Sequence, residues 1–114
     1  MTIKRVVYFV ARSENVPSVL QEVLKRSNVQ AVSIFFDLDG TRALDERYVM
    51  QISLEKRIDL PKLFKQALDS GVKLYACQMN VMNMCELHCI EGVESAGVVT
   101  FLEHAYEADA VFSY

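Results

Sequence analysis

The feature that most constrains the fold is a series of short apolar runs, rich in β-branched and aromatic residues, that recur along the chain. RVVYFV (residues 5–10) is the clearest, because it lacks the polar alternation of a strand with one face in water. AVSIFF (31–36) and VKLYA (72–76) have a similar character. Such runs are typical of strands that are buried on both faces of a parallel sheet. We therefore predict three buried strands at these positions.

Helical patterns separate these runs. After the first run, Asn15 is a helix cap, Pro17 suits a first helical turn, and apolar residues from Val16 to Leu24 recur at helical spacing. The pattern further predicts a helix from Asp59 and Pro61 to Ser70 and Gly71, a helix around 80–90, a short strand near Val93, a helix from about Gly97 to Glu107, and a last strand in AVFSY (110–114). The segment 43–57 fits neither pattern clearly.

The alternation of strand and helix along the whole chain defines the expected architecture. Parallel strands joined through helices by right-handed crossovers give a sheet that is covered on both faces. We therefore predict an α/β fold of three layers, with a parallel five-stranded sheet between helices. No linker, internal repeat or change of composition divides the sequence, so residues 1–114 form one predicted domain.

Composition and charge exclude several classes of function. Apolar residues make up 52% of the chain, and it has only four Gly and two Pro, which excludes intrinsic disorder and low-complexity binding tracts. All twelve Lys and Arg lie in residues 1–73, whereas residues 74–114 hold six acids and no Lys or Arg. A chain with a pI of 5.3 and no basic stripe is a poor nucleic-acid binder, so we expect no nucleic-acid partner.

The sequence also indicates a compartment. No apolar run approaches the roughly 20 residues of a membrane helix, and charge interrupts the first residues too early for a secretory signal. Three cysteines, an odd number without framework spacing, suit a reducing compartment. We expect a soluble, cytoplasmic protein with no membrane partner.

The second apolar run leads into a motif with possible chemistry. FFDLDGT (35–41) resembles the first motif of the haloacid-dehalogenase-like phosphatases, in which Asp37 would attack phosphorus, Asp39 would act as acid and base, and both would hold magnesium. Such a site also needs a positioned lysine and another acidic cluster, which the other predicted strand ends lack. We favour a solvated turn, because Asp and Gly favour turns after strands. A magnesium-dependent phosphatase that uses Asp37 and Asp39 is kept as an alternative.

Cys77 is the strongest candidate for chemistry. It follows the run 72–76 directly, at the carboxyl end of a predicted strand and before a predicted helix. Open α/β sheets bind ligands at this edge, and the positive amino end of a helix stabilises a reactive thiolate. The alternative is a buried core cysteine, which is common for a free thiol.

Three further residues have the spacing of metal ligands. Cys85, His88 and Cys89 could share one helix face and offer sulfur and nitrogen to zinc. Three ligands do not complete a structural zinc site, and the nearby Leu87 and Ile90 fit an apolar helix face better. We therefore expect no metal and no cofactor, and the role of these three residues stays open.

Four passages together resemble the DsrE/DsrF-like family of small sulfur-relay and uncharacterised proteins. They are the opening strand, IFFDLDG, GVKLYACQM and GVESAGVVTFLEHAYEADAVFSY, of which the last two are the most specific. The resemblance implies a flavodoxin-like parallel sheet and a homo-oligomer, either a trimer or a hexamer. It also implies that Cys77 occupies the position of the cysteine that carries sulfur in the family's sulfurtransferases. The stretch NVMNMCELHC, which follows, departs from the family's usual segment.

These observations lead to a functional prediction. The chain is expected to be a sulfur carrier or sulfurtransferase-like protein that passes sulfane sulfur through a persulfide on Cys77, between a donor and an acceptor protein. The alternative is a non-catalytic oligomeric module that binds a small ligand at the strand ends. The segment 43–57 is expected to supply part of the oligomer interface through its apolar residues Leu44, Tyr48, Val49, Met50 and Ile52.

Overall fold

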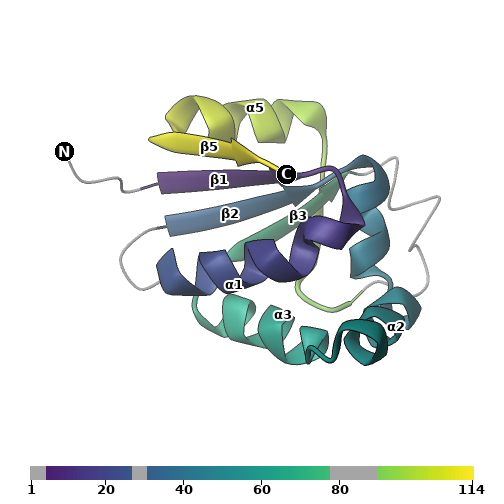
Figure 1. Cartoon of the computed structure of the whole chain (residues 1–114). Helices are drawn as coiled ribbons and strands as arrows, with labels where there is room; N and C mark the ends of the chain where they lie inside the picture. Colours follow the sequence, from purple (N-terminus) through teal and green to yellow (C-terminus); the bar gives the residue numbers. More distant parts are fainter. Residues whose placement is uncertain (1–4, 27–30, 78–89) are drawn as a thin grey trace.

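The computed structural model describes residues 5–26, 31–77 and 90–114, and strands alternate with helices along this part of the chain (Figure 1). The strands are β1 (Arg5–Val10), β2 (Ala31–Phe36), β3 (Lys73–Cys77), β4 (Val93–Ala96) and β5 (Ala110–Ser113). The α-helices are α1 (Val16–Arg26), α2 (Glu46–Lys56), α3 (Leu60–Asp69) and α5 (Val98–Glu107), and the short 3-10 helices η1 (Ser13–Asn15) and η2 (Leu38–Leu44) follow the first two strands. The predicted strands and three of the predicted helices are confirmed, whereas the helix predicted around 80–90 lies outside the described residues. In the described ranges, no helix has the length and apolar character needed to cross a membrane.

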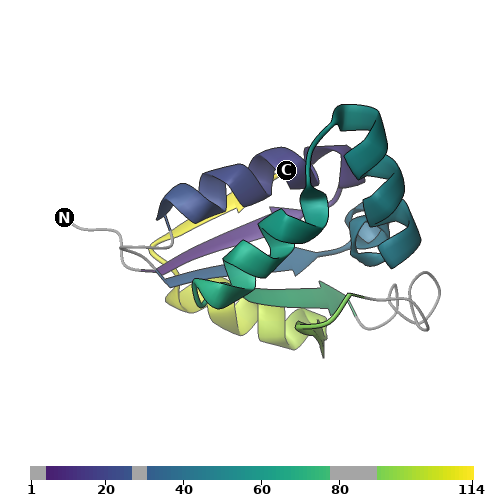
Figure 2. The ribbon, with the colours of Figure 1, turned by 90° about the horizontal axis from the view of Figure 1, so that it is seen from below.

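The five strands form one parallel sheet in the order β4-β3-β2-β1-β5. From β1 to β4 each strand is added on the same side of the sheet, and β5 then returns to the other edge beside β1. Because crossovers between parallel strands are right-handed, this reversal of direction moves α5 to the opposite face from α1 and α3. Figure 1 shows α5 above the sheet and α1 and α3 below it, and Figure 2 shows the same arrangement from below. The predicted three-layer, flavodoxin-like α/β class with a five-stranded parallel sheet is confirmed.

The central strands are buried on both faces, as their uniform apolar character predicted. Side chains alternate between the two faces of a strand. Tyr8 and Ile34 point toward the α1 and α3 layer and are fully buried. Val7, Phe35 and Tyr75 belong to a smaller buried cluster on the α5 side. Phe35 and Tyr75 stack there with ring centroids 4.7 Å apart.

The segment 43–57, which the sequence left unassigned, is the end of η2 followed by α2. Asp45 caps α2 because its side chain accepts a hydrogen bond from the backbone N–H of Arg47 at 2.9 Å. The expectation that the apolar residues of this segment supply an interface is wrong for three of them, since Leu44, Val49 and Ile52 are buried in the core of the single chain. Of the five, Met50 has a largely exposed side chain.

Candidate functional site

The carboxyl ends of the parallel strands meet at one edge of the sheet, and the candidate site lies there. Cys77 is the last residue of β3 and pairs in register with Ala96, the last residue of β4. The next residue of the chain, Gly97, begins α5. The sheet thus brings the thiol beside a helix start that is twenty residues further along the sequence.

Cys77 lines a cavity of about 240 Å³. Phe9, Phe35 and Cys77 line it from the strands, because the period of two places these side chains on the α5 face of the sheet. Phe101 closes it from α5, with its ring centroid 5.1 Å from that of Phe9 and 5.2 Å from that of Phe35. The thiol is unbonded and partly exposed. Four of the nine described lining residues are therefore Phe, and the lining includes the partly exposed cysteine.

The amino terminus of α5 forms another wall of this cavity. Ala96, Gly97 and Val98 line it, and Gly97 is the cap residue of the helix. Glycine provides no side-chain acceptor, and the first turn of α5 contains no acidic residue. The amide hydrogens of that turn consequently give this wall a partial positive charge of roughly half a unit, which favours an anionic sulfur nearby.

Asp37 is one of the lining residues of the cavity and caps the helix that follows β2. Its carboxylate accepts a hydrogen bond from the backbone N–H of Leu38 at 2.7 Å, at the start of η2. Leu38 has a positive φ of 50°, so the chain turns sharply here. Asp37 also lines the Cys77 cavity, to which it brings a carboxylate.

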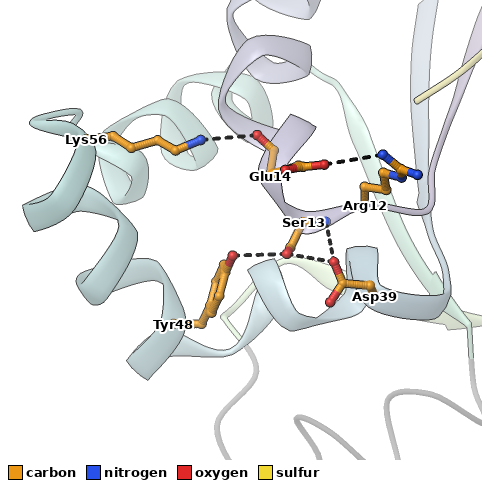
Figure 3. Close-up of polar contacts among 6 residues, drawn as sticks. All are labelled: Arg12, Ser13, Glu14, Asp39, Tyr48 and Lys56. Carbon is orange, nitrogen blue, oxygen red and sulfur yellow. Dashed lines mark hydrogen bonds and ion pairs between the residues drawn. The ribbon is translucent and has the colours of Figure 1, made fainter.

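Asp39 takes part in a separate network that joins the loops after β1 and β2 (Figure 3). One oxygen of its carboxylate accepts hydrogen bonds from the backbone N–H of Ser13 at 2.9 Å and from the Ser13 hydroxyl at 2.8 Å. The Tyr48 hydroxyl donates to the Ser13 hydroxyl at 2.9 Å, and Arg42 pairs with the other oxygen of Asp39 at 3.3 Å. The bond from the Ser13 backbone, with those from the Ser13 and Arg42 side chains, holds the pKa of Asp39 below its ordinary value.

The expected solvated turn at residues 37–40 is wrong in one respect. Gly40 and Thr41 are buried, because η2 packs against the end of β1. The backbone N–H of Gly40 donates to the carbonyl oxygen of Ala11 at 3.0 Å, and a Cβ at Gly40 would overlap the carbonyl group of Val10. The motif that resembles a phosphatase therefore forms a packed 3-10 helix whose two carboxylates bind neighbouring backbone and side-chain donors.

Other candidate residues lie elsewhere or outside the described chain. Cys85, His88 and Cys89 fall in the range 78–89, which the structure does not describe. Within the described part, no three His, Cys, Asp or Glu side chains are grouped as metal ligands. A larger hollow of about 310 Å³ lies at the opposite edge of the sheet, lined in part by Arg5, Lys73 and His104. It is remote from the thiol, because it lies at the amino ends of the strands.

Sequence reasoning identified Cys77 but missed part of its surroundings. The positions of Phe9, Phe35 and Phe101 were interpreted only as strand and helix core, and the pairing of β3 with β4 was needed to place Gly97 beside the thiol. Ser13 carried no sequence signal, since its partner Asp39 is 26 residues away.

Comparison with known proteins identifies the family of the chain. The model of the DsrE/DsrF/DrsH-like family matches residues 13–112. The chain belongs to this family. Family members are associated with sulfur relay and are often oligomeric. No curated protein matches the chain.

Among solved structures, this DsrE-like chain is similar to the crystal structure of the YchN protein from E. coli. The TM-score is 0.72 at 18% sequence identity, and the similarity covers 99% of this chain and 100% of the other. At this identity the similarity shows a common fold and no more.

Proposed function

We propose that this protein is a sulfur carrier that accepts sulfane sulfur on Cys77 and passes it on. The observation that carries the proposal is the position of the thiol: partly exposed, in a cavity at the carboxyl edge of the sheet, beside the uncapped amino terminus of α5. A carrier needs an accessible thiolate and space for one additional sulfur atom. Membership of a family associated with sulfur relay supports the same chemistry.

The proposed reaction consists of two thiol exchange steps. The Cys77 thiolate attacks the outer sulfur of a donor persulfide, R–S–SH, the S–S bond of the donor breaks, and the donor leaves as the thiolate RS⁻. Cys77 then holds the sulfur as Cys77–S–SH. A thiolate of the acceptor attacks the outer sulfur in turn and returns Cys77 to its thiolate. Neither step requires an external oxidant or reductant.

Mass spectrometry after treatment with a sulfane-sulfur donor tests this proposal. We expect a gain of about 32 Da on the peptide that contains Cys77, since a persulfide adds one sulfur atom. The Cys77→Ser protein should lose the gain, and the matched Cys85→Ser/Cys89→Ser double variant should keep it. If the added sulfur resides on Cys85 or Cys89, or on none of the three, Cys77 is not the carrier.

The cavity also favours a second candidate function, which is non-catalytic binding of a small ligand. Its volume of about 240 Å³ and its aromatic walls would accept a small apolar molecule. The two functions differ in whether they require the Cys77 thiol. A binding module needs no reactive cysteine, so Cys77→Ser would leave ligand binding intact. We place the carrier first because the thiol is reachable from the cavity.

We further propose that the protein forms a homo-oligomer, a trimer or a hexamer, in the cytoplasm, where thiols stay reduced. The outer face of α5 exposes Leu102 and Tyr106 beside the acidic Glu103. On α2, Leu54 is 81% exposed in a shallow apolar hollow that both Arg57 and Asp59 border. Two exposed apolar surfaces on different sides of one chain favour contact of α5 on one copy with α2 on the next, which is a head-to-tail arrangement that can close into a ring.

Light scattering tests this association. We expect a mass several times that of the 13.0 kDa chain at micromolar concentration. Leu102→Glu and Leu54→Glu should each reduce it to that of the single chain, because each places a charge in one of the two surfaces. Lys65→Glu, at an exposed position on α3, is the matched control and should leave the mass unchanged. A single-chain mass for the unmodified protein would refute the proposal.

A further inference from the structure

The hollow at the amino ends of the strands combines polar and charged groups that the proposed sulfur chemistry does not use. Its volume is about 310 Å³. Val7, Ser33 and Lys73 line it from the α5 face of the sheet, where they form a row because Ser33 pairs in register with both of the others. His104 and Glu107 line it from the end of α5.

Ser33 is a polar residue in the middle strand of the sheet, where burial on both faces favours apolar side chains. The sequence of β2 is AVSIFF, and Ser33 is half-buried. Among the residues that the structure describes, its hydroxyl group has no hydrogen-bond partner. A hydroxyl group can both donate and accept, so it is available to a ligand in the hollow.

Lys73 supplies a positive charge that no other described residue neutralises. Its ammonium group has no ion-pair partner in ranges 5–26, 31–77 and 90–114, and its side chain is exposed. Arg5 also lines the hollow, but its guanidinium group lies 3.1 Å from the Glu107 carboxylate, so these two charges offset each other. Because neighbouring strands are about 4.8 Å apart, Lys73 and Ser33 suit the two oxygens of one carboxylate.

The helix ends at this edge limit the charge of a ligand. The last turn of α5, which ends at Glu107, presents carbonyl groups with a partial negative charge of roughly half a unit. In α3 the last carbonyl groups already accept hydrogen bonds from the backbone N–H groups of Ser70, Gly71 and Val72. The unpaired Lys73 charge therefore exceeds the opposing partial charge. A dianion gains less, because its cost of dehydration rises with the square of its charge, whereas its attraction rises only in proportion.

The His104 ring gives the hollow a fixed wall. Its Nδ1 donates a hydrogen bond to the carbonyl oxygen of Thr100 at 2.9 Å. Its ring centroid lies 5.2 Å from that of Tyr75 and 5.3 Å from that of Phe35. Together with Val7 on the sheet, this ring provides a surface for the apolar part of a ligand.

We propose that this hollow is a second binding site, for a small organic monocarboxylate with an apolar body. The carboxylate accepts hydrogen bonds from the Lys73 ammonium group and the Ser33 hydroxyl group, and the apolar body contacts Val7 and the His104 ring. The site is separate from the Cys77 cavity, so its occupation does not depend on the proposed sulfur transfer.

NMR titration of the ¹⁵N-labelled protein tests the site, with isobutyrate as the probe and neutral isobutyramide for comparison, at an ionic strength held constant with chloride. We expect isobutyrate to shift the backbone amide signals of Ser33, Lys73 and His104 in a saturable way, with a Kd of roughly 1–50 mM for so small a ligand. Isobutyramide should bind about fivefold more weakly, because it lacks the charge that pairs with Lys73 in a solvated hollow. Sulfate should also bind more weakly than isobutyrate.

Variants separate the site from a general effect of charge. Lys73→Gln should raise the Kd for isobutyrate about fivefold, and Ser33→Ala should raise it about threefold. Lys65→Gln is the matched control, because Lys65 is exposed on α3 and its replacement changes the net charge equally. It should leave the Kd unchanged, as should Cys77→Ser.

Several results would overturn the proposal. They are amide shifts that do not saturate with isobutyrate, equal affinity for isobutyrate and isobutyramide, and tighter binding of sulfate. Equal effects of Lys73→Gln and Lys65→Gln, or an unchanged Kd in Ser33→Ala, would also contradict it. Failure of Cys77 to accept sulfur would leave this proposal intact, since the two sites have no lining residue in common.

Discussion

Replacement of Asp39 by Asn should destabilise the protein measurably, although the side chain is at the surface. Asp39 accepts two hydrogen bonds from Ser13, at 2.9 Å and 2.8 Å. Bonds to a charged acceptor contribute about 1.5–3 kcal/mol and neutral ones about 0.5–1.5 kcal/mol, so loss of the charge costs about 1 kcal/mol per bond. The Asp39 side chain is 46% exposed, and solvent screening reduces the sum to about 1 kcal/mol.

The destabilisation caused by Asp39→Asn should depend on pH in a defined direction. The hydrogen bonds from Ser13 and Arg42 lower the pKa of Asp39 in the folded state below its value in the unfolded chain, which is about 3.9. A carboxyl group of this kind stabilises the fold above the unfolded pKa, and the stabilisation is lost as the pH falls through the folded pKa. The difference between the unmodified protein and Asp39→Asn should therefore be largest at neutral pH and shrink below about pH 4.

Urea denaturation of both proteins at neutral pH and at successively lower pH measures this difference. The expected loss of about 1 kcal/mol corresponds to a fall in Tm of roughly 4 °C for a chain of this size. Asp69→Asn is the matched control, since Asp69 is exposed at the end of α3 and its replacement should cost less than about 0.5 kcal/mol. Equal losses for the two variants, or a loss for Asp39→Asn that does not decrease in acid, would refute the role of Asp39 as a charged acceptor.

Three further predictions concern the segment after β2, the cap of α3 and the phosphatase hypothesis. Gly40→Ala should destabilise the fold by about 1–3 kcal/mol in urea denaturation, because its Cβ would lie 2.9 Å from the carbonyl carbon of Val10. An unchanged free energy of unfolding would show that the backbone moves to make room for the Cβ. Asp59→Ala should cost about 1 kcal/mol in the same assay by removing the cap on the Lys62 N–H of α3, whereas Asp59→Asn should cost little; equal losses would exclude a capping role. With magnesium and an aryl phosphate, the protein should release no phosphate above the protein-free rate, and turnover that disappears in Asp37→Asn would restore the phosphatase hypothesis.

The sequence predicted the core of the fold well, because burial on both faces leaves a local signature. The run 5–10 is uniformly apolar since β1 lies between β2 and β5 and carries buried side chains such as Val7 and Tyr8 on opposite faces. The edge strand β4 has no such signature, because Glu94 and Ser95 are exposed. It was predicted only as a short strand near Val93.

Sequence patterns were less informative where one segment packs on another that is distant in the chain. In η2, the turn-forming residues after β2 indicated a solvated loop. Leu38 and Asp39 are indeed exposed, but Gly40 and Thr41 are buried where the Gly40 N–H donates to Ala11. The apolar residues of α2 indicated an interface, but Val49 and Ile52 pack into the core of the single chain. In both segments the partners are brought together by tertiary contacts, which a local pattern cannot specify.

The surroundings of Cys77 illustrate the same limit at the site itself. The sequence placed the thiol beside a helix amino terminus by assuming that the next helix along the chain supplies it, and those residues lie outside the described part. The described structure supplies one from α5 instead, because β4 pairs with β3 so that Ala96 lies opposite Cys77 and Gly97 follows at once. The helix amino terminus beside Cys77 therefore does not belong to the stretch that departs from the family's usual segment. Its place beside the thiol depends on the pairing of β3 with β4, and its partial charge depends on a cap residue without an acidic side chain. Both can be changed by substitutions at positions other than Cys77.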